Sequence, residues 1–175
     1  MMDSDESLFE RLIAGDMLAF DRIYDRFERP LFGFIQKELG DPAEAEDVFH
    51  ETFLALLRER DRARSVRSFR AWLFGVARNI CLNRVRSRRR AARALEAQRA
   101  LPRASESDDA VDEQRRSAVV EGAVERLPRP LAELYRLRAV GMTYDEIADA
   151  LSLPVGTVKS RMHQMIQRLR REALQ

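Results

Sequence analysis

The chain has 175 residues, of which 45% are hydrophobic and 34% are charged, and its formal net charge is +2. Such a hydrophobic fraction fills compact cores, so wholesale disorder is excluded, and the length suits one domain or two small ones. Apolar residues recur at three- and four-residue spacing without sustained alternation, and only 7 glycines interrupt them. This pattern predicts an all-α fold.

The sequence carries no recognisable secretion or membrane signal. Its first residues, MMDSDESLFERL, are acidic and lack the positive segment and apolar run of a signal peptide. Its apolar runs fall far short of the roughly 20 residues that span a bilayer. The single cysteine, Cys81, cannot form an internal disulfide, which fits a reducing cytosol. We therefore expect a cytoplasmic protein.

Charge is strongly segregated along the chain. Residues 1–57 carry 5 basic and 14 acidic side chains, whereas residues 58–99 carry 14 basic and 3 acidic ones. Residues 100–125 are again acidic and residues 126–175 basic. Two positive blocks separated by a negative one suggest two contacts with a polyanion, although solvated helix faces are the simpler alternative.

The first 60 residues predict helices. Residues 7–39 predict one or two of them, with Ser7 as N-cap, a break at Gly15-Asp16 and a new turn opened by Pro30. Residues 43–60 predict the next helix.

A long helix is expected after a polar loop at residues 61–67. Ser68 caps it, it runs to about Arg93, and its predicted buried stripe consists of Phe69, Leu73, Val76 and Ile80. A second stripe, flanked by Arg78, consists of Trp72, Asn79, Asn83 and Arg86. Aromatic, amide and arginine side chains on one strip suit unpaired bases and their backbone. For Trp72, ordinary packing against the preceding helices is the favoured alternative.

A linker and a second, smaller domain complete the predicted architecture. Residues 101–112, LPRASESDDAVD, contain Pro, Ser and acidic residues and predict a flexible acidic linker. We therefore expect two small helical domains, at residues 7–100 and 113–175. The second contains predicted helices at about 114–126, 129–140, 143–151 and 155–173.

The last two predicted helices have the pattern of a helix-turn-helix. Thr143 and Glu146 form a predicted capping box, and Pro154 opens the second helix. Ser152 lies in the turn, where glycine is usual because it tolerates positive φ. The second helix has an outer face suited to the major groove, or alternatively an ordinary polar face. That face consists of Thr157, Lys159, Ser160, Arg161, His163 and Gln164.

No catalytic or metal site is expected. His50 and His163 have no partner at metal-ligand spacing, and Cys81 has the character of a core residue. Neither a glycine-rich phosphate loop nor a nucleophile set occurs. We therefore predict no enzymatic activity and no cofactor.

These segments together resemble a known family. DPAEAEDVFHETFLALLRER and SFRAWLFGVARNICLNRVRSRRR resemble the signature segments of sigma domain 2, and LPRPLAELYRLRAVGMTYDEIADALSLPVGTVKSRMHQMIQRLRRE resembles sigma domain 4. Their order and spacing resemble the extracytoplasmic-function (ECF) sigma factors of the sigma-70 family. The resemblance implies a factor that binds the largest and second-largest subunits of core RNA polymerase, directs it to promoter DNA, and is held by an anti-sigma factor.

The resemblance also implies roles for residues. The polymerase clamp helices would bind Asp47, Val48, Glu51, Thr52 and Ala55. The loop at residues 61–68 would receive a base flipped from the minus-ten element, and the acidic linker would thread toward the RNA exit path. Contacts with minus-ten DNA would come from Arg64, Ser65, Arg67, Trp72, Arg78, Asn79, Asn83 and Arg86. The outer face of the last helix would read the minus-thirty-five element.

Four positions depart from the family pattern and bear on promoter preference. His50 stands where the family often has glutamine, and Asn83 stands where aspartate is usual. Ser152 replaces the usual glycine, and Gln164 replaces a common arginine. We expect the free protein to bind promoter DNA poorly, because its acidic parts oppose the basic strips until polymerase spreads the domains.

Three other functions stay open. A stand-alone helix-turn-helix regulator would leave residues 43–57 and 72–86 without a purpose. A helical enzyme or adaptor would need a pocket with titratable groups. A sigma relative with a decayed DNA face would not need the capping box and the cationic helix.

Overall fold

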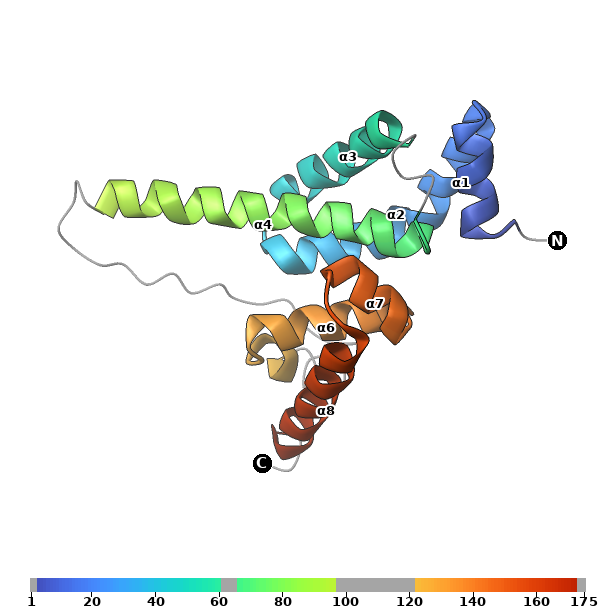
Figure 1. The fold of residues 1–175 in the computed structure, drawn as a ribbon. Coiled ribbons are helices and arrows are strands. Elements are labelled where there is room, and N and C mark those ends of the chain that lie inside the picture. The colour runs from blue at the N-terminus through green and yellow to red at the C-terminus, as the bar shows by residue number, and fades with distance from the viewer. Residues whose placement is uncertain (1–2, 61–65, 97–121, 173–175) are drawn as a thin grey trace, which may run out of the picture.

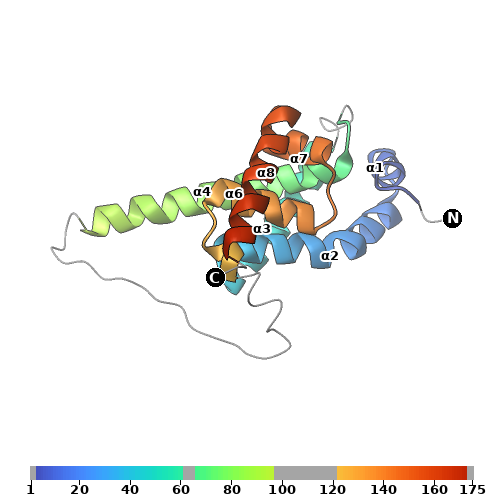
Figure 2. The same ribbon diagram turned by 90° about the horizontal axis from the view of Figure 1, so that it is seen from below.

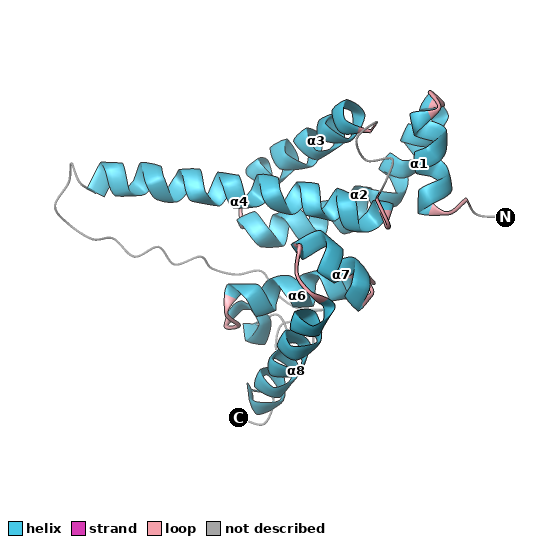
Figure 3. Cartoon of the chain, viewed as in Figure 1, coloured by secondary structure: helices cyan, strands magenta, loops and turns pink. Residues whose placement is uncertain are grey.

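The computed structural model describes residues 3–60, 66–96 and 122–172. Within these ranges the chain is helical and contains no strand, as the sequence predicted (Figure 3). The predicted linker and the first residues of the helix expected at 114–126 lie outside the described residues. The helices are α1 (Asp5–Ile13), α2 (Met17–Leu39), α3 (Pro42–Glu59), α4 (Phe69–Glu96), α6 (Arg129–Ala139), α7 (Tyr144–Leu151) and α8 (Val155–Glu172).

Two predictions for the first helices were wrong. Ser4, not Ser7, caps α1, because the Ser4 hydroxyl accepts a 3.1 Å hydrogen bond from the backbone N–H of Ser7. Pro30 lies inside α2 rather than at the start of a turn. A proline has no backbone N–H, so it cannot donate a hydrogen bond to the preceding turn of the helix. Phe27 and Leu31 nearby are buried, and their packing stabilises the helix by more than the missing hydrogen bond costs.

The long helix α4 begins as predicted and buries a different stripe. The Ser68 hydroxyl accepts a 3.2 Å hydrogen bond from the N–H of Ala71 and thereby caps the helix. Phe69 and Leu73 are buried as expected, but Val76 and Ile80 are only partly buried. The buried positions further along are Phe74, Ala77 and Cys81. The stripe is wider than predicted because α4 packs against α2 and α3 on one side and against α7 on another.

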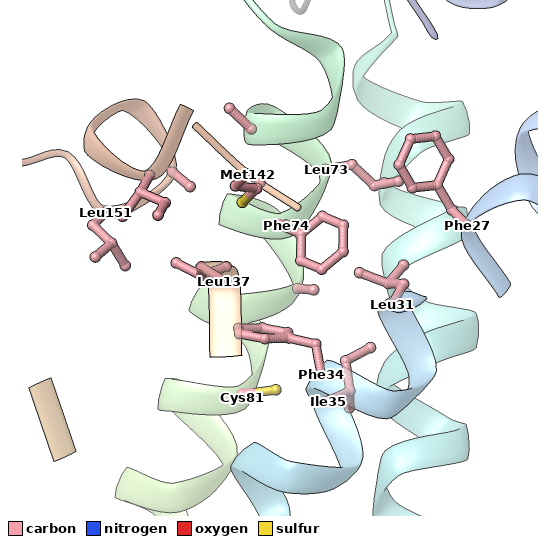
Figure 4. Packing of buried hydrophobic residues seen from close by; sticks show 14 of the residues in the cluster. Phe27, Leu31, Phe34, Ile35, Leu73, Phe74, Cys81, Leu137, Met142 and Leu151 are labelled. Carbon is pink, nitrogen blue, oxygen red and sulfur yellow. The ribbon is translucent and has the colours of Figure 1, made fainter. Parts of the chain in front are cut away.

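The described helices form two units that pack against each other. The N-terminal unit comprises α1–α4 and the C-terminal unit α6–α8; α7 lies beside α4 and α6 beside α2 in both views (Figures 1 and 2). The C-terminal end of α4 projects beyond the other helices (Figure 1). Side chains of both units join one buried cluster, which includes Leu137, Met142 and Leu151 of the C-terminal unit and Phe74 of α4 (Figure 4). Among the described helices, none is both long and apolar enough to cross a bilayer.

Candidate nucleic-acid and polymerase interfaces

The turn between α7 and α8 is set by local hydrogen bonds. The predicted capping box is present: the Thr143 hydroxyl accepts from the N–H of Glu146 at 3.2 Å, and the Glu146 carboxylate accepts from the N–H of Thr143 at 2.8 Å. Ser152 ends α7 in the left-handed region, with φ 53°, where glycine is favoured. The helix-turn-helix therefore forms although one residue adopts an unfavourable backbone conformation.

The outer face of α8 is open to solvent. Val158 and Met162 face the interior and fix the rotation of the helix. Lys159, Ser160, His163 and Gln164 are exposed, whereas Thr157 and Arg161 are half-buried. Cationic and hydrogen-bonding side chains on one exposed helix face are what phosphates and base edges in the major groove require.

The predicted strip on α4 divides into two parts. Asn79, Asn83 and Arg86 are exposed, and the arginines that follow on the projecting end of the helix extend the positive surface. Trp72 is half-buried and stacks on Phe9 and Phe69, with ring centroids 6.1 and 6.2 Å away. Trp72 thus contributes to packing, which was the favoured alternative.

The first part of the α4 strip is engaged by the C-terminal unit. Arg78 is ion-paired to Glu133 of α6, with an N–O distance of 2.5 Å. Arg67 and Trp72 line a pocket of about 420 Å³, whose opposite wall includes Asp149 and Ser152 of the C-terminal unit. Arg64 and Ser65, also predicted to contact DNA, lie outside the described residues.

The face of α3 differs from the predicted polymerase surface. Asp47 is exposed, and Glu51 is partly exposed and pairs with Arg84 at 3.1 Å. Val48, Thr52 and Ala55 are buried between α3 and its neighbours, so these three side chains do not form a free surface. Their spacing of four and three residues places them on one face of the helix, and in the structure that face points inward. The exposed face includes two residues that the sequence analysis did not select, His50 and Leu54.

Electrostatics do not indicate a reactive centre in the described chain. Burial raises the pKa of the Cys81 thiol to about 12, so the thiol stays protonated and unreactive near neutral pH. The described residues contain no group of three or more His, Cys, Asp or Glu side chains that could hold a metal ion.

Two family models match the chain in the order expected for one family. Sigma-70 region 2 matches residues 23–91, and sigma-70 region 4 matches residues 117–169. The sigma-H factor of Pseudomonas aeruginosa is 30% identical over 171 residues, which cover 91% of this chain and 89% of the relative. The chain belongs to the ECF sigma factors of the sigma-70 family. It is therefore an RNA polymerase sigma factor, in a family of non-catalytic transcription initiation factors.

Further relatives agree with this assignment. The ECF sigma-E factor of Escherichia coli K12 is 28% identical over 170 residues, covering 91% of this sigma factor and 88% of the relative. The structure of CnrH in complex with the cytosolic domain of CnrY aligns with a TM-score of 0.69 at 26% identity, covering 95% of each chain. RpoE in complex with the anti-sigma factor NepR from Bartonella quintana has the same TM-score at 22% identity, covering 88% of this chain and 96% of RpoE, and supports the fold.

Proposed function

We propose that this sigma factor binds core RNA polymerase through the exposed face of α3 and reads a two-part promoter with α4 and α8. One observation carries the proposal. Two separate exposed faces rich in cations and hydrogen-bonding groups lie in the segments that match sigma-70 regions 2 and 4. A stand-alone helix-turn-helix regulator would need only the second.

The polymerase surface is centred on Asp47 and Glu51. Leu54, which is 56% exposed on the same helix, adds an apolar anchor. Val48, Thr52 and Ala55 support this surface from inside, so substituting them acts through the packing of α3. The clamp helices of the largest subunit are the expected partner here, and the second-largest subunit is the expected partner of the linker and the C-terminal unit.

Promoter contacts divide by chemistry. Asn79, Asn83 and Arg86 bind the nontemplate strand of the minus-ten element, with Trp72, Arg78 and the loop residues Arg64, Ser65 and Arg67 completing the base-binding surface. Capture of unpaired bases offsets the cost of unstacking, which is a few kcal/mol per flipped base. The exposed face of α8 binds duplex DNA at the minus-thirty-five element.

Control by an anti-sigma factor is part of the proposal. CnrH and RpoE were each solved with a bound protein, the cytosolic domain of CnrY and the anti-sigma factor NepR. We extend this to a comparable partner that covers the polymerase-binding face of this sigma factor. The expected location is the cytoplasm, where polymerase acts, and we assign no enzymatic activity to the chain itself.

The test is transcription with purified components. The sigma factor should comigrate with core RNA polymerase in gel filtration and yield run-off transcripts from a promoter library. Arg86→Glu, at an exposed position on α4, should weaken open-complex formation at least tenfold, while Arg22→Glu, at an exposed position of α2, should not. A chain that bound duplex DNA alone and never associated with polymerase would instead be a stand-alone regulator.

A further inference from the structure

The C-terminal end of α4 extends well past the packed core. Within the described part of this helix, Cys81 is the last buried side chain and Val85 is the last that packs against the core cluster. Residues 86–94 are all exposed and project beyond the other helices (Figure 1). They are arginines, alanines and one serine. Arginine and alanine are strong helix formers, so this end stays helical although it adds nothing to the core.

Two arginines near this end hold α4 against α3. Arg84 pairs with Glu51 at 3.1 Å, and Arg88 pairs with Glu44 at 3.3 Å. Arg88 also donates a 3.1 Å hydrogen bond to the carbonyl of Leu39. Residues four apart lie on the same face of a helix, so one face of α4 has its positive charge neutralised by the chain itself.

The other arginines lie on the opposite face. Arg86, Arg90 and Arg93 are spaced by four and three residues, and each lies roughly half a turn away from the pair that contacts α3. All three are exposed, and none has an acidic partner among the residues that the structure describes. Arg90 contacts the hydroxyl of Ser87 at 3.4 Å. Like charges at this spacing repel one another, so this face is suited to an anionic partner.

This face continues the exposed amides of the α4 strip. Asn79, Asn83, Arg86, Arg90 and Arg93 follow one another at spacings of four, three, four and three residues. At 1.5 Å per residue the strip is about 21 Å long, which matches about six base pairs of DNA. Its chemistry changes along this length. Amides, which can pair with base edges, come first, and the second half carries only arginines, which suit phosphates.

We propose that Arg90 and Arg93 hold the phosphate backbone of the paired spacer DNA beside the minus-ten element. The inference rests on the proposed function, in which the start of α4 captures bases of the melted segment. That segment extends from the minus-ten element toward the start site, so the DNA at the far end of the strip is the duplex that leads to α8. Phosphate contacts fix the position of the DNA in any sequence and make binding depend on salt.

The test removes these two charges without weakening the helix. Arg90→Ala/Arg93→Ala replaces both arginines with the residue of highest helix propensity. Arg90→Lys/Arg93→Lys keeps the charges and serves as the rescue. Arg22→Ala/Arg29→Ala removes the same net charge from exposed positions of α2 and serves as the control.

The first measurement is the salt dependence of binding to fork DNA, a duplex of random sequence with a single-stranded extension. Each phosphate contact adds about 0.9 to the slope of log K against log salt. The alanine pair on α4 should therefore lower the slope by about 2 and weaken binding about tenfold. The lysine pair and the α2 control should match the parent. An unchanged slope in the alanine pair overturns the proposal.

The second measurement locates the contact on a promoter selected in the run-off library. Neutral methylphosphonate linkages replace the phosphates of the spacer directly beside the minus-ten element or, in a matched duplex, those just downstream of it. With core RNA polymerase bound, neutralising the spacer should weaken binding by the parent about tenfold. It should not weaken the alanine pair further, because that contact is already lost. The proposal is overturned if only the downstream linkages act in this way, or if neither set does.

The outcomes separate this inference from the proposed function. If no protein in the series binds polymerase while the alanine pair loses salt dependence on fork DNA, the proposed function fails and the phosphate contact is supported. If every protein supports run-off transcription and all slopes are equal, the proposed function stands and this inference fails.

Discussion

The guanidinium of Arg136 donates a 2.6 Å hydrogen bond to the carboxylate of Glu38, although 98 residues separate them in the sequence. The pair joins α6 to α2 and lies in a site where the carboxylate has almost no contact with water. Arg129 approaches the second oxygen of the same carboxylate at 3.5 Å. The closed packing of the two units therefore includes a charged centre as well as apolar contacts.

Removing the cation from this centre should be costly. Arg136→Met leaves the buried Glu38 carboxylate with Arg129 alone, and we expect a loss of about 3 kcal/mol in the free energy of unfolding. Urea denaturation measures it. The matched change Arg22→Met breaks an exposed pair with Asp3 and should cost only about 0–1 kcal/mol. Equal losses in the two variants would contradict the burial argument.

The turn of the helix-turn-helix offers a stabilising substitution. Ser152 has φ 53° and carries a Cβ that this conformation disfavours. Ser152→Gly should therefore raise the free energy of unfolding by about 1 kcal/mol, partly offset by the greater freedom of glycine in the unfolded chain. Thermal unfolding followed by circular dichroism measures the change. A lower melting temperature for Ser152→Gly would show that the serine side chain contributes more than its strain costs.

The face of α3 predicts a contrast between surface and interior. Asp47→Arg reverses an exposed charge and should weaken binding to core RNA polymerase at least tenfold while leaving stability within about 0.5 kcal/mol. Thr52→Val removes a buried hydroxyl that donates to the Val48 carbonyl at 2.7 Å, and should leave polymerase affinity unchanged because the side chain never reaches the surface. Fluorescence anisotropy against core polymerase compares the two. Equal losses of affinity would mean that Thr52 becomes accessible in the complex.

Two exposed residues of α8 should affect DNA binding differently. Lys159→Ala should weaken binding to all duplexes alike and reduce the slope of log K against log salt by about 1, because a lysine on phosphate carries no sequence information. Gln164→Ala should instead relax preference at one base pair by about 1–3 kcal/mol. Titrations of minus-thirty-five duplexes at several salt concentrations separate the effects. Loss of base preference in Lys159→Ala would reverse the two roles.

The corner between α1 and α2 should be sensitive to acid. The Arg11 guanidinium hydrogen-bonds to Asp16 and, with a coulombic contribution, holds the pKa of that carboxyl below its ordinary value of 3.8. A carboxyl whose pKa is lower in the folded chain than in the unfolded chain stabilises the fold at pH values above its unfolded-state pKa. This stabilisation is lost as the pH falls through the pKa of the folded state. The stability difference between the parent and Asp16→Asn should therefore shrink below pH 3.8. An NMR titration in which the Asp16 carboxyl showed an unshifted pKa would contradict this.

Much of the fold follows from local sequence signals. The break at Gly15-Asp16, the Ser68 cap and the Thr143–Glu146 capping box each depend on a few neighbouring residues and were predicted correctly. The exposed face of α8 followed from helical periodicity for the same reason. The order of the segments resembling sigma domains 2 and 4 was enough to predict the family.

The contacts predicted for α3 and for the start of the α4 strip stay predictions, but the structure shows which of these side chains are buried or already paired. Val48, Thr52 and Ala55 were assigned to a polymerase surface by resemblance, whereas the packing of α3 buries all three side chains. Gly75 was overlooked, although a glycine within a long helix costs roughly 1 kcal/mol relative to alanine and so needs a packing reason. The reason is the backbone of α7.

The sequence by itself determined the helical class, the caps at Ser68 and Thr143, the helix-turn-helix and the family, because these depend on residues a few positions apart. Only the tertiary structure decided that α7 and α6 dock on α4 and α2, and that Glu38 and Glu133 face arginines of the opposite unit. Contacts between residues 55 to 98 positions apart leave no periodic mark in the chain. Whether a given arginine meets DNA or a buried carboxylate is set by the packing that brings those distant residues together.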